Sequence, residues 1–230
     1  VTARLLQTVE TIAALRERIA AATVQVAWIP ALQKDARVRN THSSTAIEGN
    51  PLTLEQVREL EEGRPVAAVA QRSQREVLNY FAGLRYMEKN FGVKTITHEH
   101  VLKLHSIIAG GVMDQGDAGR YRSIMVRVGR HVPPPPEQVS GLMRELLDWW
   151  NKEAPGLSPV LSSAIVHHRF ETIHPFADGN GRVARLTANA ELSAAGEVRV
   201  VIPTVYRSNY LAGLSAFSDG TGKGEPLVAV

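Results

Sequence analysis

The chain of 230 residues contains no cysteine. Disulfide bonds and thiolate metal sites are therefore excluded, and the composition fits a reducing compartment, so we expect a cytoplasmic protein. The sequence also lacks an apolar run of the roughly 20 residues that a membrane span needs, and we expect no membrane partner. Lys and Arg number 26 against 23 Asp and Glu. Because they are scattered, nucleic acid is not an expected partner of this segment.

The remaining composition is that of an ordinary folded domain. Apolar residues make up 44% and charged residues 21%, which is close to the average and rules out a disordered tail or a coiled-coil rod. The chain begins with Val1 rather than Met and stops at the apolar string PLVAV. We therefore expect a fragment whose C-terminus is truncated.

Apolar residues recur mainly at helical spacing, which predicts an all-α fold of about seven or eight helices. A first amphipathic helix is predicted over 3–27, ended by Pro30 and followed by a short polar segment at 41–50. A capping box of Thr53 and Gln56 opens the next helix. The later helices are predicted over 66–90, 97–108, 136–152, 158–172, 180–195 and 204–217. The β-prone stretch 124–133, with Gly129 at a turn, predicts one small β-hairpin.

The string HPFADGNGRVARL at 174–186 contains the most specific chemistry. Gly179, Asn180 and Gly181 lie where a loop becomes a helix, so main-chain N–H groups and the helix N-terminus can bind an anion. Arg182 and Arg185 are three positions apart and project from one face of that helix. Two guanidinium groups beside such a loop suit a di- or triphosphate.

Two further residues of this string supply reactive groups. The carboxylate of Asp178 can hold Mg²⁺ together with phosphate oxygens. A neutral imidazole at His174 can take the proton of an incoming hydroxyl group. Each feature alone is usually structural, since Gly-Asn-Gly is often a turn and paired arginines are often a solvated face. Their combination within twelve residues favours a nucleotide site.

HPFADGNGRVAR resembles the signature of the Fic domain, H-x-F-x-(D/E)-G-N-G-R-x-x-R, at every specified position. Fic proteins are helical, and most transfer AMP from ATP to a hydroxyl side chain of a target protein. The resemblance implies that His174 is the general base and that Asp178 binds Mg²⁺. It implies that the segment from Gly179 to Arg182 holds the α- and β-phosphates, and that Arg185 contacts the γ-phosphate.

The resemblance extends to other parts of the chain. It implies that Phe176 packs in the core, and that the hairpin at 124–133 is the flap on which the target protein docks by strand addition. Tyr210 is similar to a residue beside the nucleoside. The domains expected are an N-terminal helical region over 1–65 and a Fic catalytic core over 66–230.

A second resemblance lies in the N-terminal region, which looks like the Fic class whose inhibitory helix precedes the catalytic core in the same chain. Ser44, Glu48 and Gly49 match the Fic inhibitory motif (S/T)-x-x-x-E-(G/N). A carboxylate can pair with an arginine fork, so Glu48 is expected to occupy Arg185 and to misdirect the α-phosphate of ATP. The alternative is that this segment is an ordinary helix end with a glycine after it.

The sequence thus predicts an autoinhibited protein adenylyltransferase that uses ATP and Mg²⁺ to modify a Tyr, Thr or Ser hydroxyl group. Two alternatives stay open. One is a Fic-fold enzyme that removes AMP or transfers UMP, phosphate or phosphocholine. The other is a non-catalytic regulator that binds nucleotide and partner proteins. The target protein is not encoded in a recognisable way, and a homo-oligomer is compatible with the sequence.

Overall fold

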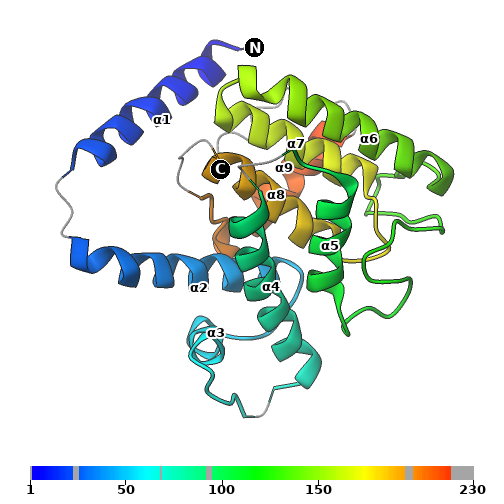
Figure 1. Cartoon of the computed structure of the whole chain (residues 1–230), viewed down its shortest axis with the longest axis horizontal. Helices are drawn as coiled ribbons and strands as arrows, with labels where there is room; N and C mark the ends of the chain where they lie inside the picture. Colours follow the sequence, from blue (N-terminus) through cyan, green and yellow to red (C-terminus); the bar gives the residue numbers. More distant parts are fainter. Residues whose placement is uncertain (1, 23–25, 68, 92–94, 195–198, 219–230) are drawn as a thin grey trace.

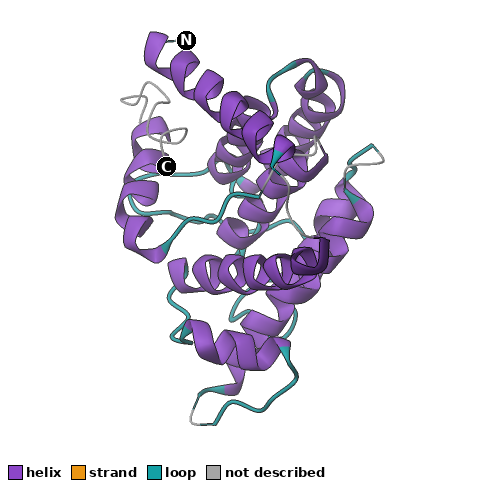
Figure 2. Cartoon of the chain, turned by 90° about the vertical axis from the view of Figure 1, so that its left-hand side faces the viewer, coloured by secondary structure: helices purple, strands orange, loops and turns teal. Residues whose placement is uncertain are grey.

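The computed structural model describes residues 2–22, 26–67, 69–91, 95–194 and 199–218. Helices joined by loops make up these segments, and Figure 2 shows no strand among them. The α-helices of the described residues are α1 (Ala3–Ala21), α2 (Ile29–Ile47), α3 (Leu54–Glu61), α4 (Gln71–Asn90), α5 (His98–Ala109), α6 (Pro136–Lys152), α7 (Pro159–Ile173), α8 (Asn180–Ala194) and α9 (Arg207–Ser218). Short 3₁₀ turns lie at Val26–Trp28, Ala154–Gly156 and Thr204–Tyr206. The predicted all-α class is confirmed.

The N-terminal region differs from the sequence prediction. The expected single helix over 3–27 is α1, which ends at Ala21, and residues 23–25 lie outside the described residues. Pro30 does not end a helix but lies in the first turn of α2, where its missing N–H would have had no helical partner in any case. Helix α2 and α1 diverge from their junction in Figure 1.

The apolar periodicity predicted a short polar stretch between helices at 41–50, whereas the resemblance implied an inhibitory helix. The segment is for the most part the last two turns of α2. Its polar side chains misled the prediction because they are buried rather than solvated. Thr45 Oγ, for example, donates a hydrogen bond to Thr41 O at 2.8 Å. Asn40, one turn earlier, accepts a hydrogen bond from Tyr80 at 3.0 Å. Polar residues such as Ser and Thr are typical of loops, so a helix face on which they are buried and hydrogen-bonded is easily mistaken for a loop in the sequence.

The centre of the molecule is the pair α7 and α8. Helix α8 also contacts α4, α5 and α2, while α6 covers the other side of α7, and Figure 1 shows this arrangement around α8. The larger hydrophobic cluster fills this region and includes Leu84, Leu104, Met143, Phe170 and Leu186. The loop between α7 and α8 is thus supported from several sides by packed side chains.

A smaller hydrophobic cluster attaches α2 and α3 to α4. It consists of Val38, Leu52, Val57, Leu60, Val66, Val77 and Phe81. These residues come from both sides of the domain boundary expected at residue 65. The predicted capping box of Thr53 and Gln56 is present at the start of α3. The Fic catalytic core expected over 66–230 also includes 219–230, which lie outside the described residues.

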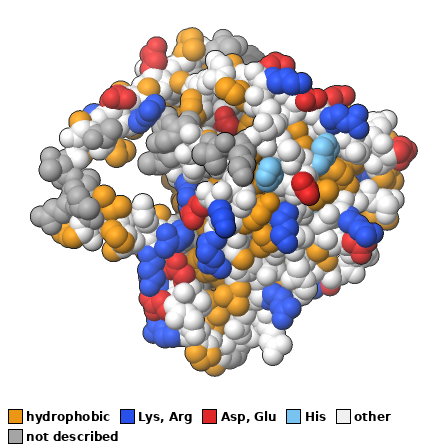
Figure 3. All heavy atoms as spheres, viewed as in Figure 1, with side chains coloured by type: hydrophobic (Ala, Val, Ile, Leu, Met, Phe, Trp, Pro, Cys, Tyr) orange, Lys and Arg blue, Asp and Glu red, His pale blue; other side chains and the backbone are white. Residues whose placement is uncertain are grey.

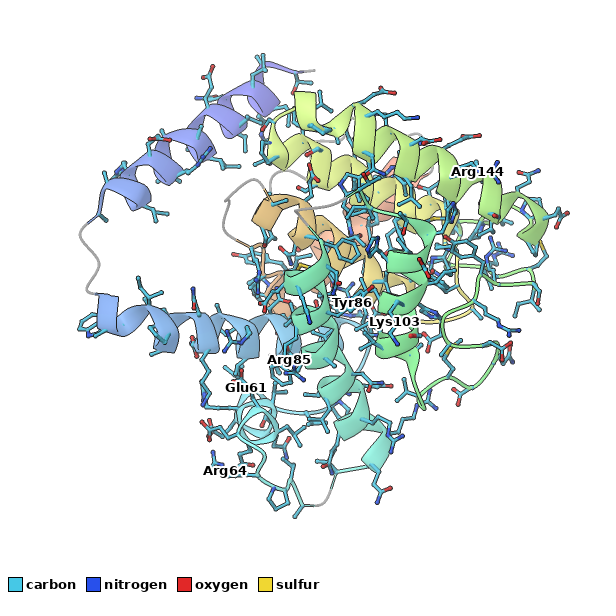
Figure 4. The ribbon with its side chains drawn as sticks, viewed as in Figure 1. Glu61, Arg64, Arg85, Tyr86, Lys103 and Arg144 are labelled. Carbon is cyan, nitrogen blue, oxygen red and sulfur yellow. The ribbon has the colours of Figure 1, made fainter. Side chains whose placement is uncertain are left out.

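Ion pairs supplement this packing at the surface. Figure 3 shows basic and acidic side chains intermixed where α2 and α3 meet. Lys34 Nζ lies 2.7 Å from Glu62 Oε1, and Glu61, at the end of α3 (Figure 4), lies 3.4 Å from Arg37 Nε. Exposed pairs of this kind contribute about 1 kcal/mol or less each, so the hydrophobic cluster holds α3 in place. None of the described helices is long and apolar enough to span a bilayer.

Candidate nucleotide site

The loop between α7 and α8 begins with an unusual main-chain conformation. His174 has φ 48° and ψ 62°, and it is the non-glycine residue with positive φ among those described. The left-handed region costs an ordinary residue about 1 kcal/mol or more. His174 N still donates to Phe170 O at 2.9 Å. The turn therefore ends α7 and redirects the chain toward α8 in a single residue.

Arg122 holds this turn in place. Its buried guanidinium donates from Nε to His174 O at 2.7 Å and from Nη2 to Pro134 O at 2.5 Å and Ile173 O at 3.3 Å. Nη1 donates to Ile124 O at 3.0 Å. One side chain thus joins the end of α7 to both ends of the expected flap. Sequence reasoning gave Arg122 no role, because its partners are main-chain carbonyl groups that leave no mark in the sequence.

Asn180 closes the loop from the other end. Its Oδ1 accepts from Phe176 N at 2.9 Å, and its Nδ2 donates to Phe176 O at 2.8 Å. The side chain, expected among the nucleotide-binding residues, is therefore occupied within the loop. Phe176 is fully buried, as expected, and stacks on His105 with ring centroids 3.6 Å apart.

His105 supports the loop from α5. Gly119 N donates to His105 Nδ1 at 2.9 Å, so the ring proton is assigned to Nε2, which donates to Asp178 O at 3.0 Å. Burial lowers the pKa of His105 to about 4, so the ring is neutral at pH 7. Sequence analysis missed this residue too, since a lone His on an apolar helix face gives no functional signal.

Asp178 keeps its carboxylate accessible. The side chain is 46% exposed, and Arg182 Nη2 lies 3.3 Å from Oδ1. Gly179 N donates to the same oxygen at 2.6 Å. Gly179 has φ 79°, a conformation that favours glycine. Within the described ranges no group of three or more His, Asp or Glu side chains could hold a metal ion. A single carboxylate nevertheless fits Mg²⁺ when phosphate oxygens and water complete its shell.

Arg185 is joined to the end of α2. Its Nη2 lies 2.7 Å from Glu48 Oε1, and it also donates to Ser44 O at 2.9 Å. Nε donates to Ser44 Oγ at 2.8 Å. Burial alone would lower the pKa of Arg185, but attraction by Tyr210 and Glu48 outweighs burial and raises it. The predicted partners Ser44, Glu48 and Arg185, far apart in the sequence, therefore form one cluster.

Two glycines accommodate Glu48. Gly49, the residue after it, has φ 93° and turns the chain away from α2. Gly181 lies beneath the carboxylate, where a Cβ atom would collide with Glu48 Oε1 and crowd Arg185. A side chain at 181, a position expected to be glycine for an anion loop, would therefore displace the Glu48 carboxylate from its present place.

Tyr210 lies behind Arg185 at 3% exposure. Its hydroxyl accepts from Arg185 Nη1 at 3.3 Å and lies 2.9 Å from His167 Nε2. Burial raises the pKa of Tyr210, so the phenol is neutral. The hydroxyl of this residue, which was expected beside the nucleoside, is occupied by Arg185 and His167.

The predicted β-hairpin at 124–133 is reduced to one antiparallel bridge. Val128 and His131 exchange two main-chain hydrogen bonds of 3.0 Å around Gly129 and Arg130. The ladder cannot continue, because prolines from residue 133 onward have no N–H to donate. His131 Nε2 donates to Thr172 O at 3.0 Å and attaches the segment to α7. The apolar side chains exposed along it are Ile124, Met125, Val128 and Val132.

The loop between α7 and α8 thus brings the imidazole of His174 and the accessible carboxylate of Asp178 to the N-terminus of a helix that carries Arg182 and Arg185. Comparisons with known proteins agree. The Fic/DOC family model matches residues 95–192. A Fic family protein from Desulfovibrio desulfuricans superimposes with a TM-score of 0.84 at 32% identity, over 99% of this chain and 70% of that one. The chain belongs to the Fic/DOC family.

Other relatives are also similar. Fic-1 from Caenorhabditis elegans superimposes with a TM-score of 0.88 at 28% identity, over 99% of this chain and 68% of that one. Protein adenylyltransferase Fic of Drosophila willistoni is 37% identical over 191 residues, which are 82% of this chain and 38% of the relative. The chain thus spans about two fifths of the length of that relative.

The two hydrogen bonds of Asn180 generate a prediction about stability. Asn180→Asp keeps the shape but replaces the donor to Phe176 O with an oxygen, so two acceptors would face each other. We expect the free energy of unfolding to fall by about 1–3 kcal/mol, measured by urea denaturation. Asn209→Asp, an exposed position on α9, is the matched control and should change it by less than about 0.5 kcal/mol. Equal effects in both variants would show that the two hydrogen bonds between Asn180 and Phe176 do not stabilise the fold.

Proposed function

We propose that this protein is a protein adenylyltransferase held inactive by its own α2. The observation that carries the proposal is the placement of Glu48 on Arg185 beside a complete Fic loop. The relatives named protein adenylyltransferase Fic support the reaction class. The donor is ATP, and the acceptor is a Tyr, Thr or Ser hydroxyl group of another protein.

The reaction is an in-line displacement at the α-phosphorus. The target oxygen attacks phosphorus, its proton passes to His174, and pyrophosphate leaves with the electron pair of the broken P–O bond. Main-chain N–H groups of Asn180, Gly181 and Arg182 at the start of α8 hold the phosphates, while Gly179 N donates to Asp178 Oδ1. Because the side chain of Asn180 is engaged with Phe176, that residue serves the nucleotide through its main chain.

Mg²⁺ would be held by Asp178, whose half-exposed carboxylate lies at the entrance of the loop. Bound there with the nucleotide, the ion supplies charge neutralisation for the phosphates. Arg182 is the protein cation closest to this carboxylate, at 3.3 Å, and would assist in binding the same phosphates.

The inhibition follows from the charge of Arg185. In the proposed active state this guanidinium binds the γ-phosphate, but here Glu48 and Ser44 occupy it. A triphosphate bound without that contact would present its α-phosphorus at the wrong angle to the attacking oxygen, and misalignment alone slows such reactions strongly.

The target protein is proposed to dock on the segment 124–133. Its apolar side chains are exposed, and Val128 and His131 form one antiparallel bridge. An extended peptide can add to such an edge through main-chain hydrogen bonds. Arg122 and His131 attach this segment to the end of α7, which would place a docked hydroxyl group near His174.

Glu48→Gly tests the proposal by a gain of activity. We expect AMP transfer to itself and to lysate proteins to rise at least about tenfold, because Arg185 becomes available to the nucleotide. Labelled ATP, UTP, GTP and CDP-choline supplied in parallel identify the donor, and mass spectrometry identifies the modified protein. His174→Ala in the same background should abolish transfer.

Glu62→Gly is the matched control for this experiment. Glu62 also follows the end of a helix, also precedes a glycine, and pairs with Lys34 rather than with the site. It should leave transfer at the wild-type level. Adding Arg185→Ala to Glu48→Gly should remove most of the gain. A Glu48→Gly protein that folds and binds ATP but transfers no faster would refute the inhibition.

Asp178→Ala tests the metal. Calorimetry of ATP binding in the Glu48→Gly background, with and without Mg²⁺, should show that Mg²⁺ strengthens binding only when Asp178 is present. Asp114→Ala is the control, since this exposed carboxylate pairs with Arg72 at 2.6 Å. The same Mg²⁺ effect in all three proteins would remove Asp178 from the metal site.

Val128→Pro tests the docking segment. Proline removes the N–H that donates to His131 O and stiffens the chain. In the Glu48→Gly background we expect labelling of the target to fall at least about fivefold, while hydrolysis of ATP to AMP stays within about twofold, because water needs no docking. Undiminished target labelling would place docking elsewhere.

A further inference from the structure

A largely shielded carboxylate lies behind His174 and has no part in the function proposed above. Glu171 is in the last turn of α7, three residues before His174, and the left-handed turn folds the imidazole back over it. Glu171 Oε2 lies 3.6 Å from His174 Nδ1, with side chains 13% and 16% exposed. The imidazole thus has one nitrogen directed at a carboxylate.

Glu171 is ionised in this environment. Burial alone would raise its pKa, but interaction with His174 and the positive charge of Arg185 outweigh burial and lower the pKa. An ionised carboxylate inside a protein needs a hydrogen-bond donor, because an unpaired buried charge costs several kcal/mol. The side chains around it are the first candidates for that donor.

Among the imidazole rings around Glu171, that of His174 has a nitrogen within 4 Å of the carboxylate. Arg185 directs its N–H groups to Ser44, Glu48 and Tyr210. His167 uses Nε2 for Tyr210. His174 Nδ1 is buried, has no hydrogen-bond partner within 3.5 Å, and lies just beyond that limit from Glu171. A small rotation of either side chain completes the bond.

We propose that Glu171 is a positioning residue that fixes the tautomer and the orientation of His174. This inference rests on the proposed function for its catalytic consequence. A neutral imidazole has one N–H, and an ionised acceptor at Nδ1 keeps the proton there. The lone pair of Nε2 is then available to the target hydroxyl. When that proton arrives, the ring becomes a cation that Glu171 stabilises, as the carboxylate of a catalytic triad does.

The experiment compares Glu171→Gln with Glu191→Gln, both in the Glu48→Gly background. Glu191 is also a shielded carboxylate, hydrogen-bonded to Trp150 and Ser162 at 2.6 Å, but it lies on α8 away from the loop. We expect Glu171→Gln to lower kcat for AMP transfer at least about tenfold. The Kd for ATP should stay within about twofold, since no phosphate contact is changed. Glu191→Gln should retain kcat.

A spectroscopic readout separates positioning from structure. In ¹⁵N-histidine spectra near neutral pH, the ring signals that vanish in His174→Ala should show a protonated Nδ1 and an unprotonated Nε2. Glu171→Gln should lose this fixed pattern, because an amide can either accept from Nδ1 or donate to it. Thermal unfolding of both variants checks that the fold is retained.

Several outcomes would overturn the inference. They are a kcat within about twofold of the parent, an equal loss in Glu191→Gln, or ring-nitrogen signals that do not depend on Glu171. If the Glu48→Gly parent transfers no AMP at all, the proposed function fails. The ring-nitrogen pattern still decides the positioning role in that case, so the two failures are distinguishable.

Discussion

The need to neutralise Arg185 governs the rest of this site. The guanidinium is almost fully buried, and its donors reach α2 through Ser44 and Glu48 and α9 through Tyr210. Burying such a cation without an anion would cost several kcal/mol. The fold therefore creates a position that an anion must occupy. In this structure the occupant is a carboxylate of the same chain, and in the proposed active state it is a phosphate.

The loop that would hold the nucleotide is fixed by groups that do not face it. Arg122, Asn180 and His105 bond the main chain of the loop from its base, its interior and its α5 side. Their polar atoms are used in doing so, which leaves Asp178 and the N–H groups at the start of α8 for a ligand. A loop in a left-handed conformation at His174 persists only when its surroundings determine it in this way.

The sequence alone singled out the candidate site residues whose side chains are charged or titratable. The string from His174 to Arg185 and the distant Glu48 could be singled out because their combination matches a family signature, although each feature alone is usually structural. The all-α class followed from periodicity. Pro30 was misassigned because a proline is equally compatible with the end of one helix and the first turn of the next.

Other parts could not be predicted, for physical reasons. Arg122 and His105 bond main-chain carbonyl groups. Because every residue has such a group, the sequence does not indicate which residues these side chains contact. The end of α2 looks like a loop because its Ser and Thr side chains are polar, whereas in the fold they are buried and hydrogen-bonded. The bridge at Val128 is shorter than the predicted hairpin because prolines stop the ladder. Each error concerns a contact between segments that only the fold brings together.

The way α2 is attached limits how the proposed inhibition can be released. Val38 and Ile47 of α2 are buried, and withdrawing the helix would expose both, at about 1.5–3 kcal/mol for each side chain. It would also break the bond of Asn40 with Tyr80 and that of Arg207 Nε with Ile47 O at 2.8 Å. Turning only the half-exposed side chain of Glu48 away from Arg185 breaks one charged hydrogen bond, worth about 1.5–3 kcal/mol. A phosphate can repay that loss directly, since it offers Arg185 an anion in return. Local rotation of Glu48 is therefore the less costly route, and α2 can stay docked while the proposed active state forms.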